Sequence, residues 1–327
     1  MAGENIAFDL IGDVHGHAGA LRRLLAELGC RERDGVYRHP SRRVIFVGDF
    51  IDRGPSQREV LAIVRPMIDS GAALAVMGNH EFNAVAWATP DPSSPGEYLR
   101  PHSDKNRQQH QAFLDAWRGD EPGCRDVIDW FRTLPLWLEL PGLRVVHACW
   151  HPDHVARLLR HTVDGRLADA DAWRQASTRG EVLYRSVEVL LKGLELPLPG
   201  GCVFVDKDGT RRDKVRTRWW RNGSPSWREV ALGPRTLTEQ MPAGGPAGPE
   251  LPGYPADAPP VFLGHYWLDG PPAPLAPNVA CLDYSVARGG SLTAGAGSSS
   301  FGRSISSRCR RVERITAGAG ARRSSAA

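Results

Sequence analysis

Short apolar runs recur along the first half of the chain, and each is bounded by residues typical of turns. Runs of this length, rich in valine, isoleucine, leucine and phenylalanine, predict buried β-strands. In the first half of the chain they cover residues 6–11, 43–47, 72–77 and 143–147. Two further runs of the same character lie late in the chain, at residues 261–263 and 278–282.

Between the first strands, the apolar spacing changes to that of a helix. A helix over 18–28 is predicted by leucines three and four residues apart: Leu21, Leu24, Leu25 and Leu28. A second helix is predicted over 56–70, with Ser56 as its N-cap and Gly71 at its end. Strands that alternate with helices in this way predict an α/β layered fold.

A long insertion separates the strand at 143–147 from the strand at 261–263. We expect it to span about residues 151–260. It contains a predicted helix over 180–191, a predicted hairpin over 197–220 and a loop rich in proline, glycine and alanine over 241–260. We therefore predict one domain over residues 1–292 that carries this insertion.

The last 35 residues, 293–327, differ abruptly from the rest. Gly, Ala and Ser make up 20 of them, and seven are arginine. This composition predicts a disordered, low-complexity basic tail. Two explanations stay open: a genuine basic tail, or a reading-frame slip that replaced the native C-terminus. The abruptness of the change favours the second.

The charge distribution and the hydropathy exclude several classes of protein. The tail carries a net charge of +6, so the chain's total of +4 leaves −2 for the body, and nucleic acid is not an expected partner. No segment approaches the roughly 18 uninterrupted apolar residues that a membrane span requires. The first residues have neither the basic start nor the apolar core of a signal peptide. We expect a cytoplasmic protein without membrane contact.

Three polar segments each follow a predicted strand directly. They are Gly12-Asp13-Val14-His15-Gly16, Gly48-Asp49-Phe50-Ile51-Asp52-Arg53-Gly54 and Gly78-Asn79-His80-Glu81. Two single histidines, His147 and His265, occupy similar positions later in the chain. In an open α/β sheet, ligands bind beyond the carboxyl ends of the strands, so we expect these side chains to converge there.

The residue types in these segments are those of a metal site. Aspartate, asparagine and histidine supply oxygen and imidazole ligands without thiolates, which suits manganese, iron or zinc. Two ions roughly 3.5–4 Å apart can share one carboxylate, and Asp49 is the candidate bridge. We expect two divalent metal ions, with manganese favoured and iron, zinc or nickel as alternatives. The competing interpretations are turn chemistry for the aspartates and Asn79, and a structural core role for His147 and His265.

Taken together and in this order, the three segments resemble the calcineurin-like metallophosphoesterase superfamily. Its motifs run Asp-x-His, Gly-Asp-x-x-Asp-Arg-Gly and Gly-Asn-His-Asp/Glu. The resemblance covers about residues 6–292 and implies an α/β/β/α sandwich, in which two sheets lie between helices and the insertion partly roofs the cleft. It implies metal-dependent hydrolysis of phosphoesters, in which a water activated by the metals attacks phosphorus.

The resemblance also implies a role for each motif residue. One metal would be held by Asp13, His15 and Asp49, and the other by Asp49, Asn79, His147 and His265. His80, paired with Asp52, would protonate the leaving oxygen. Arg53 would clamp the phosphate, because a guanidinium fork matches phosphate oxygens; the alternative for Arg53 is a plain salt bridge.

The substrate class depends on the branch of the superfamily. Asp52-Arg53-Gly54 together with Glu81 looks most like the phosphoprotein phosphatases, so a serine/threonine protein phosphatase is the leading prediction. The segments after His147 and His265 depart from the eukaryotic enzymes and look more like a bacterial subgroup. A symmetrical bis(5'-nucleosyl)-tetraphosphatase, which acts on nucleotides, is the alternative. A homologue inactivated by damage at its C-terminus is a second alternative.

Other residues near the motifs have less specific signals. Trp150 and Trp267 follow presumed ligands closely and either wall the site or pack in the core. Arg216, Arg218 and Arg221 in the insertion either supply a second phosphate clamp or form a solvated β-face, and we favour the second. Six other histidines are expected at the surface or at helix ends: His17, His102, His110, His151, His154 and His161.

Overall fold

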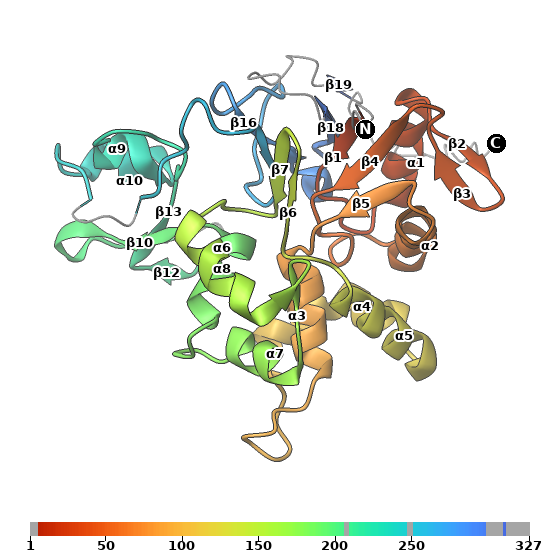
Figure 1. Ribbon diagram of the computed structural model, residues 1–327. Coiled ribbons are helices and arrows are strands. Elements are labelled where there is room, and N and C mark those ends of the chain that lie inside the picture. Colours follow the sequence, from red (N-terminus) through yellow and green to blue (C-terminus); the bar gives the residue numbers. More distant parts are fainter. Residues whose placement is uncertain (1–5, 206–208, 247–250, 299–309, 312–327) are drawn as a thin grey trace, which may run out of the picture.

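The computed structural model describes residues 6–205, 209–246, 251–298 and 310–311. Two β-sheets form its centre, with helices around them, and a smaller group of elements lies to one side (Figure 1). The architecture confirms the predicted α/β layered fold, with mixed sheets flanked by helices. Among the described residues, no helix is long and apolar enough to cross a membrane.

The first sheet has the strand order β17-β18-β1-β4-β5, with β19 beside β18. Its strands are β1 (Ala7–Ile11), β4 (Arg42–Phe46), β5 (Ala73–Ala75), β17 (Asp283–Tyr284), β18 (Ser291–Ser298) and β19 (Arg310–Arg311). β1, β4 and β5 run parallel, and β18 pairs antiparallel with β1. The predicted strands at 6–11, 43–47 and 72–77 are thereby confirmed.

The second sheet has the order β16-β15-β7-β6. Its strands are β6 (Trp137–Leu140), β7 (Leu143–Val146), β15 (Val261–Leu263) and β16 (Val279–Cys281). β7, β15 and β16 run parallel and β6 is antiparallel to β7. The two late strands predicted at 261–263 and 278–282 are therefore parallel members of this sheet.

Period-two patterning divides the core into layers. Side chains alternate between the two faces of a strand, so alternate residues of the central strands meet between the sheets. That inner layer consists of Phe8, Leu10, Ile45, Val47, Val76, Leu143, Val145, Phe262, Ala280 and Leu282. The opposite faces of β1 and β4, with Ile11 and Phe46, pack among residues of the covering helices such as Leu24 and Val64. Because both faces are buried, these strands appear in the sequence as short continuous apolar runs.

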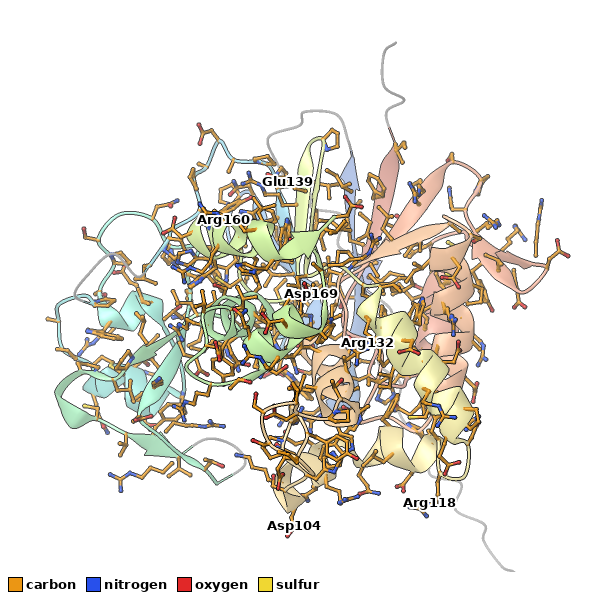
Figure 2. The ribbon with its side chains drawn as sticks, turned by 60° about the horizontal axis from the view of Figure 1, so that its bottom comes forward. Asp104, Arg118, Arg132, Glu139, Arg160 and Asp169 are labelled. Carbon is orange, nitrogen blue, oxygen red and sulfur yellow. The ribbon has the colours of Figure 1, made fainter. Side chains whose placement is uncertain are left out.

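Ten helices are described. They are α1 (Ala18–Glu27), α2 (Gln57–Asp69), α3 (Asn79–Ala88), α4 (Asp104–Ala116), α5 (Glu121–Arg132), α6 (Pro152–Leu158), α7 (Ala170–Ser177), α8 (Tyr184–Lys192), α9 (Trp227–Val230) and α10 (Arg235–Gln240). The first two confirm the predicted helices, and Ser56 is the N-cap residue of α2. Asp104 and Arg118, at the two ends of the α4 region, lie at the lower edge of the molecule (Figure 2).

The insertion holds a small sheet and several hairpins. β10 (Glu195–Pro197) pairs antiparallel with β13 (Lys214–Thr217), which confirms the predicted hairpin, and β14 (Ala231–Leu232) joins β13. The insertion also holds the two-stranded ladders β8–β9 (Thr162–Val163, Arg166–Leu167) and β11–β12 (Phe204–Val205, Arg211–Arg212). A third ladder, β2–β3 (Arg31–Arg33, Val36–Arg38), lies near the start of the chain. The helix predicted over 180–191 begins later, at Tyr184, and the described residues of 241–260 contain neither helix nor strand.

The end of the chain requires one correction. The boundary predicted between residues 292 and 293 falls inside β18, which continues to Ser298 and pairs with β1 from Ala7↔Ser298 to Ile11↔Ala294. The physical reason lies in the inner layer. A Cβ on Gly297 would lie 3.1 Å from Leu143 Cδ2 and 3.2 Å from Leu10 Cδ1. The residues in this stretch are therefore small because they pack closely against the core. The predicted disordered tail beyond it falls mostly outside the described residues.

Candidate metal centre

The predicted site residues converge at one edge of the two sheets. Asp13 and His15 follow β1, Asp49 follows β4, and Asn79 and His80 open α3 just beyond β5. His147 and His265 follow β7 and β15 of the second sheet. All of these side chains are buried. The carboxyl ends of five parallel strands thus deliver every predicted metal ligand to the same place.

The local backbone is strained where these side chains turn inward. His15, Asp49, Asp52, Arg53 and His265 have positive φ angles between 45° and 71°. Non-glycine residues in this region cost on the order of 1 kcal/mol or more each, and such strain concentrates at functional sites. Close packing adds to the constraint, because a Cβ on Gly78 would lie 2.2 Å from Asp49 Oδ1 and one on Gly264 would lie 1.9 Å from Asp13 Oδ1.

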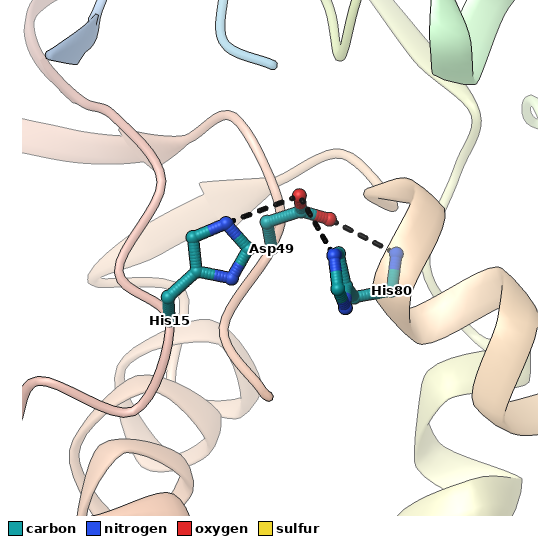
Figure 3. Close-up of side chains that lie close together, drawn as sticks. All are labelled: His15, Asp49 and His80. Carbon is teal, nitrogen blue, oxygen red and sulfur yellow. Dashed lines mark hydrogen bonds and ion pairs between the residues drawn. The ribbon is translucent and has the colours of Figure 1, made fainter. Parts of the chain in front are cut away.

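Asp49 stands at the centre of the cluster. Its Oδ2 lies 3.3 Å from His147 Nε2, 3.6 Å from His15 Nε2 and 4.0 Å from His80 Nε2. Its Oδ1 accepts a hydrogen bond of 3.0 Å from the backbone N–H of His80. Figure 3 shows His15 and His80 on opposite sides of this carboxylate. Two groups of potential metal ligands share Asp49: one with His15 and His80, the other with His147 and His265.

The imidazoles are oriented by backbone carbonyls. His15 Nδ1 donates to the carbonyl of Ile51 at 3.0 Å, and His147 Nδ1 donates to the carbonyl of Val47 at 2.7 Å. Each ring therefore directs its Nε2 toward the carboxylate of Asp49. His147 Nε2 also lies 3.2 Å from the Asn79 Oδ1, another acceptor. Lone pairs that face one another at these distances repel unless a proton or a cation lies between them.

The electrostatics of the site favour bound cations. Among the described side chains, Asp13 Oδ1, His15 Nε2 and His265 Nε2 are buried atoms without a hydrogen-bond partner. Burial lowers the pKa of His15 to about 4, which leaves its imidazole neutral and able to ligate. Burial, with the nearby charges of Asp283 and Asp49, raises the pKa of Asp13. A divalent ion would satisfy these atoms and offset this repulsion, so the residues fit a two-metal centre.

His80 occupies a different position from the other imidazoles. Its Nδ1 donates to Asp52 Oδ2 at 2.5 Å, as predicted, and its Nε2 faces Asp49. Burial alone would lower the pKa of His80, but the charges of Asp49 and Asp52 raise it above the ordinary value. The ring is thus held in one orientation and favours the protonated form.

Three side chains at the site were missed by the sequence analysis. His110, expected at the surface, is buried on α4, and its Nδ1 lies 3.0 and 3.2 Å from the two oxygens of Asp52. Glu81 accepts hydrogen bonds from the backbone N–H groups of Asp49, Phe50 and Gly78 at 2.8–3.0 Å. Asp283 accepts from the N–H groups of Trp267 and Ser285. Glu81 belongs to the third motif, but its role as a hydrogen-bond acceptor was not predicted. His110 and Asp283 lie outside the motifs, so no local pattern marked them.

The arginines and tryptophans near the site separate into two sets. The Trp267 ring lies 5.7 Å from that of His15 and walls the site, whereas Trp150 is buried beside Arg144. The positive charge of Arg53 acts to lower the pKa values of His15 and His80. The charge of Arg216 adds to the effect of burial, which lowers the pKa of His265. Arg216 from β13 lies near the site, because its Cζ is 5.8 Å from the centre of the ring of Tyr266, the residue after His265.

The two other insertion arginines differ from Arg216. The Arg218 guanidinium donates to the backbone carbonyls of Glu229 and Ala231, so its role is structural. Arg221 is exposed. The solvated β-face that we favoured is therefore wrong: of the three arginines, only Arg216 lies in a strand, and its side chain is half-buried.

Residues 6–193 match a family model described as calcineurin-like phosphoesterase. A curated protein from Oceanobacillus iheyensis, named bis(5'-nucleosyl)-tetraphosphatase PrpE [asymmetrical], is 41% identical over 157 residues, which are 45% of this chain and 57% of the relative. One from Aromatoleum aromaticum, named bis(5'-nucleosyl)-tetraphosphatase, symmetrical, is 32% identical over 155 residues, 47% of this chain and 48% of the relative. The chain spans about half the length of these curated relatives.

Solved structures are similar at lower identity. A structure titled as a putative diadenosine tetraphosphatase covers 90% of this chain and 91% of its own, with a TM-score of 0.44 and 17% identity. A protein serine/threonine phosphatase from Saccharomyces cerevisiae covers 86% of this chain and 68% of its own, with a TM-score of 0.46 and 17% identity.

Proposed function

The chain belongs to the calcineurin-like phosphoesterase family, and from that premise we propose that it hydrolyses bis(5'-nucleosyl) tetraphosphates. The fold and the site support metal-dependent hydrolysis of a phosphoester or phosphoanhydride bond. The narrower proposal rests on the names of the curated relatives, which are tetraphosphatases. We therefore favour the tetraphosphatase, which was the alternative prediction from the sequence, and place the serine/threonine phosphatase second.

One observation carries the proposed chemistry: a single buried carboxylate, Asp49, lies between two clusters of imidazoles. Asp13, His15 and Asp49 would hold one divalent ion, and Asp49, Asn79, His147 and His265 the other. When bound, such ions provide Lewis acidity and lower the pKa of water. The side chains contribute fixed geometry, since their backbone contacts and their burial leave them little freedom to rearrange.

The remaining residues act on the phosphoryl group and the leaving group. His80 is oriented by Asp52 and favours its protonated form, so we assign to it the transfer of a proton to the departing oxygen. Arg53 and Arg216 bring positive charge to the site from two different elements, and we assign to both the binding of phosphate oxygens. Because these groups are in place before the reaction, they stabilise developing charge without reorganisation.

The position of the cleaved bond distinguishes the two kinds of relative. Hydrolysis of the central bond of diadenosine tetraphosphate yields two molecules of ADP, whereas an off-centre cut yields AMP and ATP. The experiment measures both product pairs from the manganese-loaded protein, beside inorganic phosphate released from a phosphothreonine peptide. We expect nucleotide products from the dinucleotide at a higher kcat/KM than phosphate from the peptide. The reverse order would return the protein phosphatase to first place.

Two aspartate variants separate the site from contaminating activity. Asp49→Asn removes the shared carboxylate charge and should lower activity on every substrate by at least about a hundredfold. Asp129→Asn changes the same charge on an α5 side chain that is 79% exposed, and should leave activity unchanged. Equal activity of Asp49→Asn and wild type would contradict the proposal, as would a wild type inactive on all substrates, which would favour the inactive-homologue alternative.

A further inference from the structure

Two arginines lie over one tryptophan ring at the edge of the metal centre. The Arg53 Cζ is 5.5 Å from the centre of the Trp267 ring, and the Arg288 Cζ is 4.7 Å from it. Arg53 follows β4, Trp267 follows the ligand His265, and Arg288 ends the 3₁₀ turn η3 (Val286–Arg288). Three segments far apart in the sequence therefore meet at this ring.

The position of the tryptophan is fixed by the surrounding backbone. Trp267 has a φ of 53°, and its N–H donates to the buried carboxylate of Asp283 at 2.7 Å. The same carboxylate accepts from the N–H of Ser285 at 3.0 Å, and Ser285 begins the η3 turn with a φ of 59°. Asp283 thus ties the segment that carries Trp267 to the segment that carries Arg288. The spacing between the ring and the second arginine follows from this shared anchor.

The two guanidinium groups form an unbalanced pair of positive charges. Both side chains are exposed, and neither forms an ion pair with a carboxylate among the residues that the structure describes. Their distances to the ring place their Cζ atoms no more than about 10 Å apart, comparable to the Debye length of about 8 Å at physiological salt. Like charges this close repel, and an anion between or beside them would remove that repulsion.

An anion bound by these two arginines would lie next to the phosphate that reacts at the metal centre. The Trp267 ring is 5.7 Å from the ring of His15, a proposed metal ligand, and Arg53 is the proposed phosphate clamp. Arg288 lies over the same ring but belongs to a different segment. A phosphomonoester has one phosphate, which the metal centre and Arg53 already serve. A polyphosphate chain has further phosphates, each with a negative charge that needs a cation.

From this geometry we propose that Arg288, held on Trp267, forms a distal subsite that binds the phosphate chain of a polyphosphate substrate beyond the bond that is cleaved. The subsite selects polyphosphates over phosphomonoesters. It deepens the proposed function and rests on it for the identity of the natural substrate, but the binding of a polyphosphate chain can be measured separately.

The test compares Arg288→Gln with wild type, both loaded with manganese. The substrates are diadenosine tetraphosphate and p-nitrophenyl phosphate. Arg288→Gln should raise KM for the dinucleotide by about tenfold or more, the loss expected for a charge-assisted hydrogen bond. It should leave kcat/KM for p-nitrophenyl phosphate within about twofold of wild type. Arg33→Gln, the same change on an exposed residue of the β2–β3 hairpin, is the matched control and should alter neither.

A binding measurement keeps the subsite and the function distinguishable. The analogue of diadenosine tetraphosphate with methylene groups in place of all three bridging oxygens, in which neither the central nor an off-centre bond can be hydrolysed, serves as a competitive inhibitor of p-nitrophenyl phosphate hydrolysis. Its inhibition constant should rise about tenfold in Arg288→Gln. An unchanged inhibition constant and an unchanged KM would overturn the subsite. A wild type that binds the analogue but never cleaves the dinucleotide would overturn the proposed function and leave the subsite standing.

Discussion

At the scale of single residues, Asp52 shows how the site orients its proton donor. Its carboxylate accepts from His80 on one side and from His110 on the other, and all three side chains are buried. Burial alone would raise the pKa of Asp52, but the hydrogen bonds from His110 and His80 lower it below the ordinary range. The carboxylate therefore stays charged and can fix the His80 ring. His110 reaches it from α4, more than 50 residues further along the chain.

We predict that His110 is a positioning residue for this proton transfer. His110→Phe keeps the stacking on Phe113, whose ring centre is 4.7 Å away, but removes the donor to Asp52. It should lower kcat about tenfold on phenyl phosphate, whose leaving group needs a proton, and less on p-nitrophenyl phosphate. His110→Asn, which can still donate to Asp52, should restore much of the loss. Equal losses on both esters, with no recovery in the asparagine variant, would indicate a purely structural role.

A second residue-scale prediction concerns pH and lies away from the metals. Burial, with the neighbouring charges of His151 and Arg157, lowers the pKa of His154 to about 4. Above its ordinary pKa of about 6.5 this residue is neutral in both the folded and the unfolded chain. As the pH falls from about 6.5 toward 4, the unfolded chain binds a proton that the folded chain refuses, so the free energy of unfolding decreases.

The variant that tests this is His154→Gln, because an amide can still reach Ser186, whose hydroxyl lies 3.0 Å from His154 Nδ1. Chemical denaturation of the metal-free proteins at pH 7 and pH 5 gives the change in stability for each. Wild type should lose more stability over this interval than the variant does. Identical losses in the two proteins would show that His154 titrates in the folded chain as it does in the unfolded one.

At the scale of elements, whether a strand or helix could be predicted from the sequence depends on how many of its residues are apolar. The six predicted strands of the central sheets, β1, β4, β5, β7, β15 and β16, are largely buried on both faces, so their runs were recognised to within a few residues. α4 was not predicted because its only buried residues are His110 and Phe113, and two buried positions are too few to form a recognisable helical pattern. α5 has an apolar stripe of Val127, Ile128, Trp130 and Phe131 at helical spacing and could have been recognised. α3 begins with motif residues, which drew attention to their chemistry instead of their helix.

The site residues divide in the same way, into those that a local sequence pattern marks and those that only tertiary contacts bring to the site. All six predicted metal ligands converge, because each follows a strand and the strands share one edge. Glu81 lies in a motif, but its contacts and those of His110 and Asp283 form only in the folded chain, so no motif or spacing reveals their roles. Residues 293–298 of β18 were assigned to the tail because stretches rich in glycine, alanine and serine usually indicate a loop. Between two closely packed sheets, however, those residues are small because little space remains.

The placement of β18 leads to a stability prediction. Gly297→Val would press new methyl groups against Leu10 and Leu143 in the inner layer, and should lower the free energy of unfolding by about 1–3 kcal/mol. Gly244→Val is the matched control, because a Cβ there would meet nothing within 4 Å. Urea denaturation measures both. A Gly297→Val protein as stable as wild type would mean that this part of β18 does not face the inner layer, and would revive the boundary at residue 292.

At the scale of the whole molecule, the metal centre joins the two sheets. Its ligands come from loops after β1, β4 and β5 in one sheet and after β7 and β15 in the other. Without cations, the buried and unpartnered atoms of Asp13, His15 and His265 destabilise this junction. Bound ions should therefore stabilise the complete fold, and the effect should be visible in its global unfolding.

We predict that manganese at about one hundred times its dissociation constant stabilises the chain by about 2.7 kcal/mol per site. The measurement is a thermal melt of the EDTA-treated protein with and without added manganese. The melting temperature should rise in wild type and in Asp129→Asn, and rise much less in Asp49→Asn. A cooperative melt that ignores manganese would contradict the coupling of the metal centre to the fold.

The most direct test of the account is the number of metal ions bound per chain. The purified protein is stripped with EDTA, reloaded with manganese, freed of excess metal by gel filtration and analysed for manganese and protein. The Asp49-centred arrangement predicts two ions per chain in wild type and no more than one in Asp49→Asn. A wild-type ratio close to zero, or a ratio that Asp49→Asn leaves unchanged, would contradict a two-metal centre built on this carboxylate.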